Sequence, residues 1–264
     1  MQIHQFSLKS AKHQVFQQKE LVGAIALSDS GGIIASMASG FSWIDLEKGM
    51  KVLLSSPESH LPNNRFNDGK CDPAGRFWSG TMDVLDAPHA GNLYLLNSDL
   101  RVEKKISGVS CSNGLAWSLD HKTMYFIDSP LRCVKSYAFD VESGAISDER
   151  VAINLGAEPG VPDGMTIDSE GMVLIAFFGG WRVGRYDPTI GKHLESLFLP
   201  VANVTSCTFG GEDLQDLYVT SAKAVLNESD LEKQPLAGSL FVFKNVSPGG
   251  LPATKFRSDK AFGN

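Results

Sequence analysis

The chain has 264 residues, a formal net charge of −6 and a hydrophobic fraction of 42%. The acidic balance argues against nucleic-acid binding, which usually requires a basic face. No apolar run has the length of a membrane-spanning helix, and the first residues lack the basic start and apolar core of a secretion signal. We therefore expect a cytoplasmic protein with no membrane and no nucleic acid among its partners.

The predicted elements are short strands that repeat along the chain. Strand-like segments that begin with a small or polar residue start at positions 23, 68, 113, 163 and 207, so that successive starts lie 44 to 50 residues apart. Each contains an apolar strand, an acidic or glycine-containing turn and a second apolar strand. Further strands are expected between these units, at residues 43–45, 93–97, 137–140 and 185–188, and a surface insertion at residues 222–234.

This spacing is typical of β-propellers, whose four-stranded blades repeat every ~40–50 residues. The strands are rich in β-branched and aromatic residues, and no segment keeps a long helical period without a breaker. The chain starts almost at once with a strand-like segment at residues 3–8. We therefore predict an all-β fold: a six-bladed β-propeller that forms a single domain over residues 1–264, with its first blade incomplete at the N-terminus.

The four cysteines are not arranged as a metal-binding or redox motif. None forms a CxxC pair, and a chain of this length does not need disulfides to be stable. We expect four reduced and mostly buried thiols, at positions Cys71, Cys111, Cys133 and Cys207.

Polar residues stand at the start of several predicted first strands. They are Arg65, Asn67, Asp68, Asn113, Asp163 and the pair Ser206 and Cys207. In a propeller the starts of these strands converge on one mouth of the central channel, which makes them candidates for a common site. The alternative stays open, because Asx–Gly dipeptides such as Asn113–Gly114 and Asp163–Gly164 are frequent turn signals.

The carboxylate of Asp163 and the amide oxygen of Asn113 offer hard oxygen ligands. Such ligands favour Ca²⁺, Mg²⁺ or Mn²⁺ over thiophilic metals. Two ligands with a single negative charge would hold a cation weakly, so a third, anionic ligand from another blade is expected. The sequence contains no HExxH motif, P-loop or GxGxxG motif, and it has Ser where a nucleophile elbow needs Gly.

Several motifs in register resemble those of the gluconolactonase, regucalcin and senescence-marker-protein family, also called LRE-like. They are NRFNDGK at residues 64–70, GTM at 80–82, SNGLAWS at 112–118, PDGM at 162–165, RYDP at 185–188 and TSCTFGG at 205–211. The resemblance runs from about Ile3 to the end of the chain. It implies a six-bladed propeller with one divalent cation in its channel, and hydrolysis of sugar lactones to aldonic acids.

The resemblance also implies roles for single residues. Asn113 and Asp163 would be metal ligands for one divalent cation (Ca²⁺, Zn²⁺, Mn²⁺ or Mg²⁺), and Asp163 would also be catalytic, as the general base or by holding the attacking water. Arg65 and Asn67 would bind the hydroxyl and carbonyl oxygens of the substrate. The implied partner is a small-molecule sugar lactone, and the protein is expected to be a monomer or a weak homo-oligomer.

Two departures from the family pattern leave an alternative function open. The metal-binding Glu of the family lies in a segment that would fall upstream of Met1, and Glu20 and Glu47 do not match its motif. An acidic substrate contact that follows GTM in some members has only loose substitutes here, Asp83 or Asp86. The alternative is a non-catalytic or impaired propeller that binds a cation or another ligand. A weaker alternative is a propeller hydrolase acting on other esters or on organophosphates.

Overall fold

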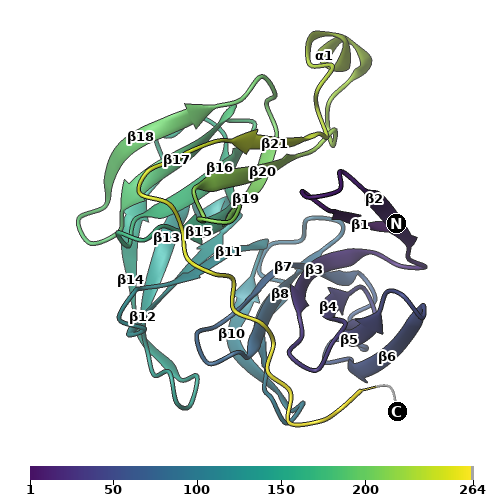
Figure 1. Ribbon diagram of the computed structural model, residues 1–264. Coiled ribbons are helices and arrows are strands. Elements are labelled where there is room, and N and C mark those ends of the chain that lie inside the picture. Colours follow the sequence, from purple (N-terminus) through teal and green to yellow (C-terminus); the bar gives the residue numbers. More distant parts are fainter. Residues whose placement is uncertain (263–264) are drawn as a thin grey trace. The chain divides into compact units, whose positions relative to one another are not determined.

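The computed structural model describes residues 1–262, and almost all of their regular structure is β-strand. These residues group into two compact units, one formed by Met1–Ser112 with the segment from Thr254 onward, the other by Asn113–Ala253. Each unit is built from antiparallel sheets in which consecutive strands of the chain lie side by side (Figure 1). The expectation of one domain over the whole chain stays a prediction.

Unit 1 contains a two-stranded sheet and two four-stranded sheets. The two-stranded sheet pairs β1 (Gln2–Phe6) with β2 (His13–Gln17). The first four-stranded sheet contains β3 (Val22–Leu27), β4 (Ile33–Met37), β5 (Gly40–Asp45) and β6 (Met50–Ser55). The second contains β7 (Asn64–Cys71), β8 (Phe77–Asp83), β9 (Gly91–Leu96) and β10 (Val102–Val109).

Unit 2 contains two four-stranded sheets and one three-stranded sheet. The first strand of the unit, β11, begins at Ser112, the residue before the start of unit 2 at Asn113. The first consists of β11 (Ser112–Trp117), β12 (Thr123–Asp128), β13 (Cys133–Phe139) and β14 (Ile146–Asn154). The second consists of β15 (Val161–Ile167), β16 (Val173–Phe178), β17 (Arg182–Asp187) and β18 (Lys192–Phe198). The third consists of β19 (Val204–Gly210), β20 (Asp216–Ser221) and β21 (Leu240–Phe243).

Five consecutive antiparallel sheets of this kind are the blades of an all-β propeller fold, which confirms the predicted class. The predicted number of six blades is wrong for the described residues. The strand expected at residues 3–8 pairs with β2 alone, so the sheet it belongs to has two strands and no others.

A shift in strand register recurs in four of the first strands, defined here as the strand at which each blade begins (β3, β7, β11, β15 and β19). In β7 the pairing passes from Phe66 directly to Gly69, and in β15 from Pro162 directly to Met165. Strands β3 and β19 show the same shift at Gly23 and Thr205. Each of these four strands therefore holds one residue more than its partner, which is a β-bulge, and bulges redirect side chains.

Two glycines allow the first strands of unit 2 to approach each other closely. A Cβ atom on Gly114 of β11 would lie 2.5 Å from the Cβ of Met165 and 2.9 Å from the carbonyl oxygen of Asp163. A Cβ on Gly164 of β15 would lie 2.4 Å from the Oγ of Ser206 in β19. These distances leave no room for a side chain, so glycine is required where β11, β15 and β19 meet.

The hydrophobic core lies between neighbouring blades of each unit. In unit 2, Tyr125 and Val134 from one blade pack with Phe177 and Tyr186 from the next. In unit 1, residues of β4, β5, β8 and β9 pack around Phe256, which the C-terminal segment places beside β3. Burial between blades explains why the strands are apolar on both faces.

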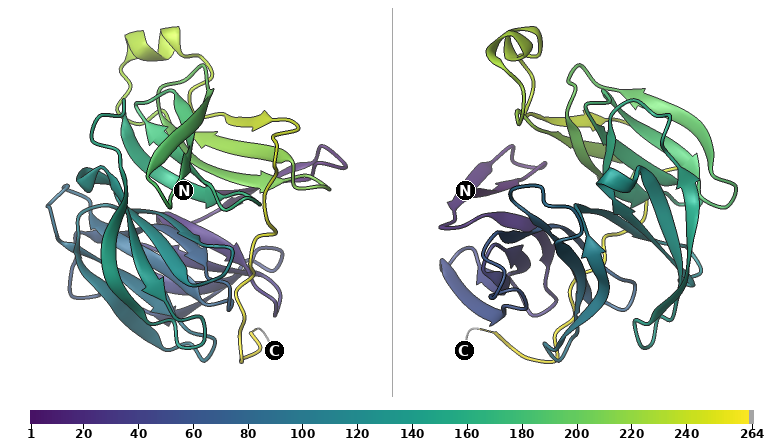
Figure 2. Two further views of the ribbon diagram at one scale, coloured as in Figure 1. Left: turned by 90° about the vertical axis from the view of Figure 1, so that its left-hand side faces the viewer. Right: turned by 180° about the vertical axis from the view of Figure 1, so that it is seen from behind.

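The predicted surface insertion is confirmed between β20 and β21. It contains the short helix α1 (Glu228–Lys233), which projects beyond the ends of β20 and β21 (Figure 2), while Leu231 packs against the core of unit 2. The side chain of Asn227 accepts a hydrogen bond from the backbone N–H of Asp230, and the side chain of Asp230 accepts one from the backbone N–H of Asn227. This reciprocal capping box supplies partners for N–H groups that a helix start leaves unpaired.

Candidate functional site

Asn113 and Asp163 lie beside each other on the adjacent first strands β11 and β15. Asn113 is 6% exposed and Asp163 is half-buried. The Nδ2 atom of Asn113 donates to the Oγ of Ser129 at 2.7 Å, and this hydroxyl donates to the carbonyl oxygen of Pro162 at 2.6 Å. The structure thus sets the two residues expected to bind a cation on neighbouring strands, and one hydroxyl group links Asn113 to the peptide that precedes Asp163.

The alternative reading of the Asx–Gly dipeptides as turns is wrong. Asn113–Gly114 lies within β11, and Asp163–Gly164 lies within β15 at its bulge. Glycine follows the polar residue because the neighbouring strand approaches too closely for a side chain, as described above. The Asx–Gly dipeptides can be recognised in the sequence, but the physical reason for the glycine is the close packing of neighbouring blades.

Arg65 and Asn67 form the second pair, on β7 of unit 1. The Nη1 atom of Arg65 donates to the Oδ1 of Asn67 at 2.8 Å and to the carbonyl oxygen of Phe66 at 3.1 Å. Asn67 in turn donates from Nδ2 to the carbonyl oxygen of Ser112 at 2.8 Å. Asn67 therefore fixes the guanidinium of Arg65, and both side chains are half-buried.

Asp68 follows Asn67 in the same bulge. Burial raises the pKa of its carboxyl group, and the charge of Lys70 and the N–H of Gly69 offset this only in part. The Oδ1 atom accepts that Gly69 N–H at 2.7 Å. Sequence reasoning named Asp68 among the polar strand starts but gave it no role.

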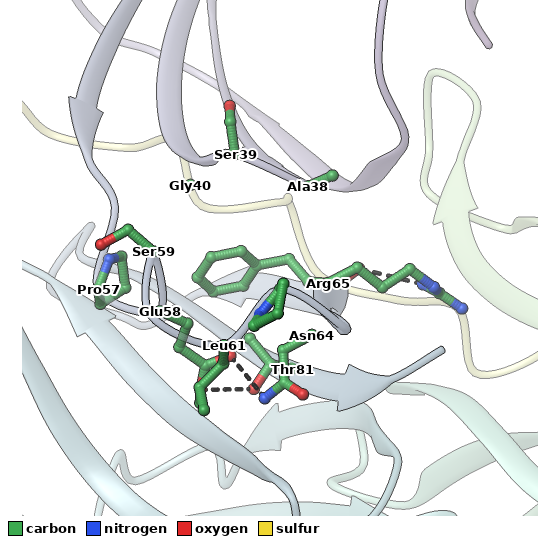
Figure 3. A pocket seen from close by; sticks show the side chains of 12 residues that line it. Ala38, Ser39, Gly40, Pro57, Glu58, Ser59, Leu61, Asn64, Arg65 and Thr81 are labelled. Atoms are coloured by element: carbon green, nitrogen blue, oxygen red, sulfur yellow. Dashed lines mark hydrogen bonds between the residues drawn. The ribbon is translucent and has the colours of Figure 1, made fainter. Parts of the chain in front are cut away.

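A carboxylate that sequence reasoning missed supports the start of β7. Glu58 lines a pocket of about 290 Å³ in unit 1, together with Asn64, Arg65 and Thr81. Its carboxylate accepts hydrogen bonds from Asn64 at 3.0 Å, Thr81 at 3.0 Å, Asn92 at 2.5 Å and Tyr94 at 3.0 Å. Figure 3 shows the Glu58 carboxylate facing Asn64 and Thr81, while the side chain of Arg65 extends away from it.

Two of the other acidic residues considered from the sequence, Glu20 and Asp83, have local partners. The carboxylate of Glu20 accepts hydrogen bonds from Ser39 and Lys51; burial raises the pKa of this group, but those hydrogen bonds lower it by more. Asp83 is buried and accepts from the N–H of Leu85 at 2.7 Å. Neither carboxylate lies in the unit that contains Asn113 and Asp163.

The donor atoms of Asn113 and Asp163 suit a hard divalent cation. One amide oxygen and one carboxylate are ligands that Ca²⁺, Mg²⁺ or Mn²⁺ accept, with water completing the shell. Within residues 1–262, no group of three or more His, Cys, Asp or Glu side chains could hold a metal ion. That finding concerns only such groups, so the expected third, anionic ligand beside Asn113 and Asp163 stays a prediction, and the two residues fit a cation that keeps several waters.

The cysteines are free, as expected: Cys71, Cys133 and Cys207 are buried, while Cys111 is half-buried. Burial raises the pKa of the Cys71 thiol, which disfavours the reactive thiolate. The Sγ of Cys207 lies 3.5 Å from the carbonyl oxygen of Leu174 and is enclosed by apolar side chains.

In residues 1–262, no helix is long and apolar enough to cross a membrane.

Comparison with known proteins agrees with the arrangement of these motifs. The profile of the SMP-30/Gluconolactonase/LRE-like region matches residues 1–223. Regucalcin of Oryctolagus cuniculus is 43% identical over 236 residues, which cover 88% of this chain and 79% of that protein. Human regucalcin is 41% identical over 235 residues, covering 87% of this chain and 79% of that protein.

Two solved structures are similar over most of the chain. A luciferin-regenerating enzyme matches with a TM-score of 0.90 and 33% identity, covering 96% of this chain and 87% of its own. A calcium-binding regucalcin from Agrobacterium tumefaciens matches with a TM-score of 0.91 and 30% identity, covering 97% of this chain and 86% of its own. The protein whose strands, bulges and polar pairs are described above therefore belongs to the SMP-30/gluconolactonase/LRE-like family.

Proposed function

We propose that this protein is a divalent-metal-dependent hydrolase that opens sugar lactones to aldonic acids. The observation that carries the proposal is the link from Asn113 through Ser129 to the peptide before Asp163, which holds an amide and a carboxylate on adjacent strands. Membership of a family that includes gluconolactonases supports the same activity. The proposed setting is the cytoplasm, with a small-molecule lactone as substrate and the protein as a monomer or weak homo-oligomer.

In this proposal Asn113 and Asp163 hold the cation, and Asp163 also acts on the attacking water. A bound divalent cation would polarise the lactone carbonyl and lower the pKa of water. The carboxylate of Asp163 accepts the proton that the water loses as it attacks, which is general base catalysis. When the ring C–O bond breaks, the ring oxygen takes up the proton that Asp163 accepted and leaves as an alcohol, so the carboxylate is restored.

Arg65 is proposed to orient the substrate. Its bonds to Asn67 and to the Phe66 carbonyl use the Nη1 group, and no partner among the described residues is found for Nε or Nη2. A guanidinium held in this way presents planar donors to an oxygen-rich ring. Asn67 fixes the plane of that guanidinium and contributes to lactone binding through it.

The test is acid release from glucono-1,5-lactone after EDTA treatment, with Ca²⁺, Mn²⁺, Mg²⁺ or Zn²⁺ restored one at a time. We expect metal-dependent turnover in the wild type and at least a ~100-fold loss in Asp163→Ala, because a general base contributes about 10²–10⁴-fold. Glu232→Ala, which removes an exposed carboxylate of α1 in the same unit, serves as the control and should keep full activity.

A second candidate function rests on the donor set. The two candidate ligands, Asn113 and Asp163, together offer a cation a single negative charge, and so small a charge holds a divalent cation weakly. The alternative is a propeller that binds a cation or another ligand without turnover. Two results together would favour this alternative: calorimetry detects Ca²⁺ binding that Asp163→Ala abolishes, and lactone hydrolysis stays at the spontaneous rate. Turnover of other esters or organophosphates in place of lactones would favour the related hydrolase.

A further inference from the structure

Ser129 occupies the position between the two candidate cation ligands. Its hydroxyl is 2.7 Å from the Nδ2 of Asn113 and 2.6 Å from the carbonyl oxygen of Pro162, the residue before Asp163. Ser129 is 5% exposed and Asn113 is 6% exposed, so both contacts are shielded from water. All four residues belong to unit 2.

The local backbone holds the serine in this place. Strand β12 ends at Asp128, and a single 3-10 turn, η1 (Ser129–Leu131), begins at the next residue. Pro130 fixes the backbone dihedral at the second position of this turn. The N–H of Arg132 donates to the carbonyl of Ser129 at 3.0 Å and closes the turn. Ser129 therefore extends from a rigid corner rather than from a long loop.

The chemistry of the three groups determines the direction of the two hydrogen bonds. The carbonyl oxygen of Pro162 can only accept, so Ser129 must use its single proton to donate to it. The Ser129 oxygen can then only accept from the side chain of Asn113. An amide that faces an acceptor must present its NH₂ group, and its oxygen points to the other side.

We propose that Ser129 is a positioning residue that sets which end of the Asn113 amide serves as a cation ligand. With the Ser129 proton committed to Pro162, an amide flip would bring the Asn113 oxygen against an oxygen that has no proton to give. The hydroxyl also ties this amide to the peptide that precedes Asp163, so one group holds both ligands at a fixed separation. The inference rests on the proposed role of Asn113 and Asp163.

The binding test compares Ser129→Ala with Ser129→Thr by titration calorimetry with Ca²⁺ and Mn²⁺. Loss of a group that orients a metal ligand typically weakens metal affinity 10–100-fold, and we expect Ser129→Ala to fall in this range. Ser129→Thr retains the hydroxyl and should recover most of the affinity. Ser221→Ala is the matched control, since that hydroxyl also donates to a backbone carbonyl of unit 2, at 2.8 Å from Ser239.

A double-mutant cycle separates positioning from a general loss of stability. In an Asn113→Ala background there is no amide to orient, so adding Ser129→Ala should change Ca²⁺ affinity less than twofold. An equal loss in both backgrounds, or wild-type affinity in Ser129→Ala, would overturn the proposal. Circular dichroism of each variant confirms that the titrations report on folded protein.

The orientation of the amide can also be measured without any metal. The Nδ2 protons of Asn113 give an NMR signal that is assigned by its loss in Asn113→Asp. We expect this signal to exchange slowly in the wild type and to shift and exchange at least tenfold faster in Ser129→Ala. A wild-type protein that neither binds a cation nor opens a lactone would contradict the proposed function, but the NMR signal would still report the orientation of the Asn113 amide. A signal that is the same in Ser129→Ala as in the wild type would contradict only the role of Ser129.

Discussion

The β-bulges of β7 and β15 use the same backbone feature for different chemistry. In β7 the bulge follows Phe66 and carries Asn67, which is bound to the guanidinium of Arg65. In β15 the bulge follows Pro162 and carries the carboxylate of Asp163. The β7 bulge therefore presents N–H groups that donate hydrogen bonds. The β15 bulge presents a negatively charged oxygen that is suited to bind a cation.

The two bulges also differ in what supports them. The strand that carries the first begins at Asn64, whose side chain donates to the carboxylate of Glu58. The second is supported by the neutral hydroxyl of Ser129, which binds the peptide carbonyl of Pro162. The comparison shows that a repeated backbone fixes where the candidate side chains stand, while separate contacts in each unit fix how they are oriented.

Apart from the loss of activity expected for Asp163→Ala, the largest effect is expected where the β15 bulge meets β19. In Gly164→Ala the new Cβ would lie 2.4 Å from the Oγ of Ser206 and 2.8 Å from the carbonyl oxygen of Thr205. Because the backbone oxygen cannot rotate away, β15 or β19 must shift, and we expect a loss of about 2–3 kcal/mol in the free energy of unfolding. Urea unfolding measures it.

The control for this change is Gly156→Ala, in the same unit. There the new Cβ would meet a side-chain atom, the Oδ1 of Asn154, at 3.2 Å. We expect Gly156→Ala to alter the free energy of unfolding by less than about 1 kcal/mol. Equal losses in the two variants would contradict the view that close strand packing fixes the β15 bulge.

A smaller effect is expected at the support of β7. Glu58 accepts four hydrogen bonds, and the side-chain oxygen of Gln would leave at least one donor facing its NH₂ group. An unsatisfied buried donor costs about 1–3 kcal/mol, so Glu58→Gln should lower the melting temperature by several degrees. Glu232→Gln, on the exposed helix α1, should leave it unchanged. If Glu58→Gln melted like the wild type, Glu58 would not support the strand.

The smallest effect concerns Asp68, next to Asn67 in the first bulge. Its folded-state pKa is raised above 3.8, so the fold favours the protonated carboxyl. The protonated Asp68 carboxyl therefore adds to the free energy of unfolding. This contribution is fully present below the pKa of the unfolded state and is lost as the pH rises through the raised pKa of the folded state. Asp68→Asn stays neutral and keeps an oxygen for the Gly69 N–H, so it should be more stable than the wild type at pH 7.

Thermal unfolding of both proteins between pH 4 and pH 8 measures this difference. The advantage of Asp68→Asn should shrink toward the acidic end, because the wild-type carboxyl is then protonated as well. An advantage that does not vary with pH would show that burial of the Asp68 charge is not its cause.

Much of the fold could be predicted from the sequence, because each blade repeats the same order of strand, turn and strand. The surface insertion was also found, since residues 222–234 break that order. Its helix was missed, although Asn227 and Asp230 have the spacing of a capping box. The number of blades was wrong because strand patterns do not say which strands pair, and β1 pairs with β2 alone.

Candidate residues were located through the repeat, but their supports were not. Asn113 and Asp163 occupy equivalent places in two blades, and the structure sets them on adjacent strands. Ser129 and Glu58 stand outside the repeated positions, in a 3-10 turn and a connecting loop, and no sequence pattern marked them. Their roles depend on contacts with residues 6 to 36 positions away, which sequence spacing alone does not reveal.

The recurrent bulges bear on how readily such a protein can acquire new chemistry. A bulge residue stands outside the hydrogen-bond ladder, so exchanging its side chain leaves the pairing of the blade intact. In β3 this route is closed, because a Cβ on Gly23 would lie 2.6 Å from the carbonyl oxygen of Asn67. In β19 it is open: Thr205 is half-buried, and its hydroxyl contacts Thr220 at 2.8 Å. A single codon change at Thr205 thus introduces a new functional group without a new fold, which makes this position a starting point for laboratory evolution.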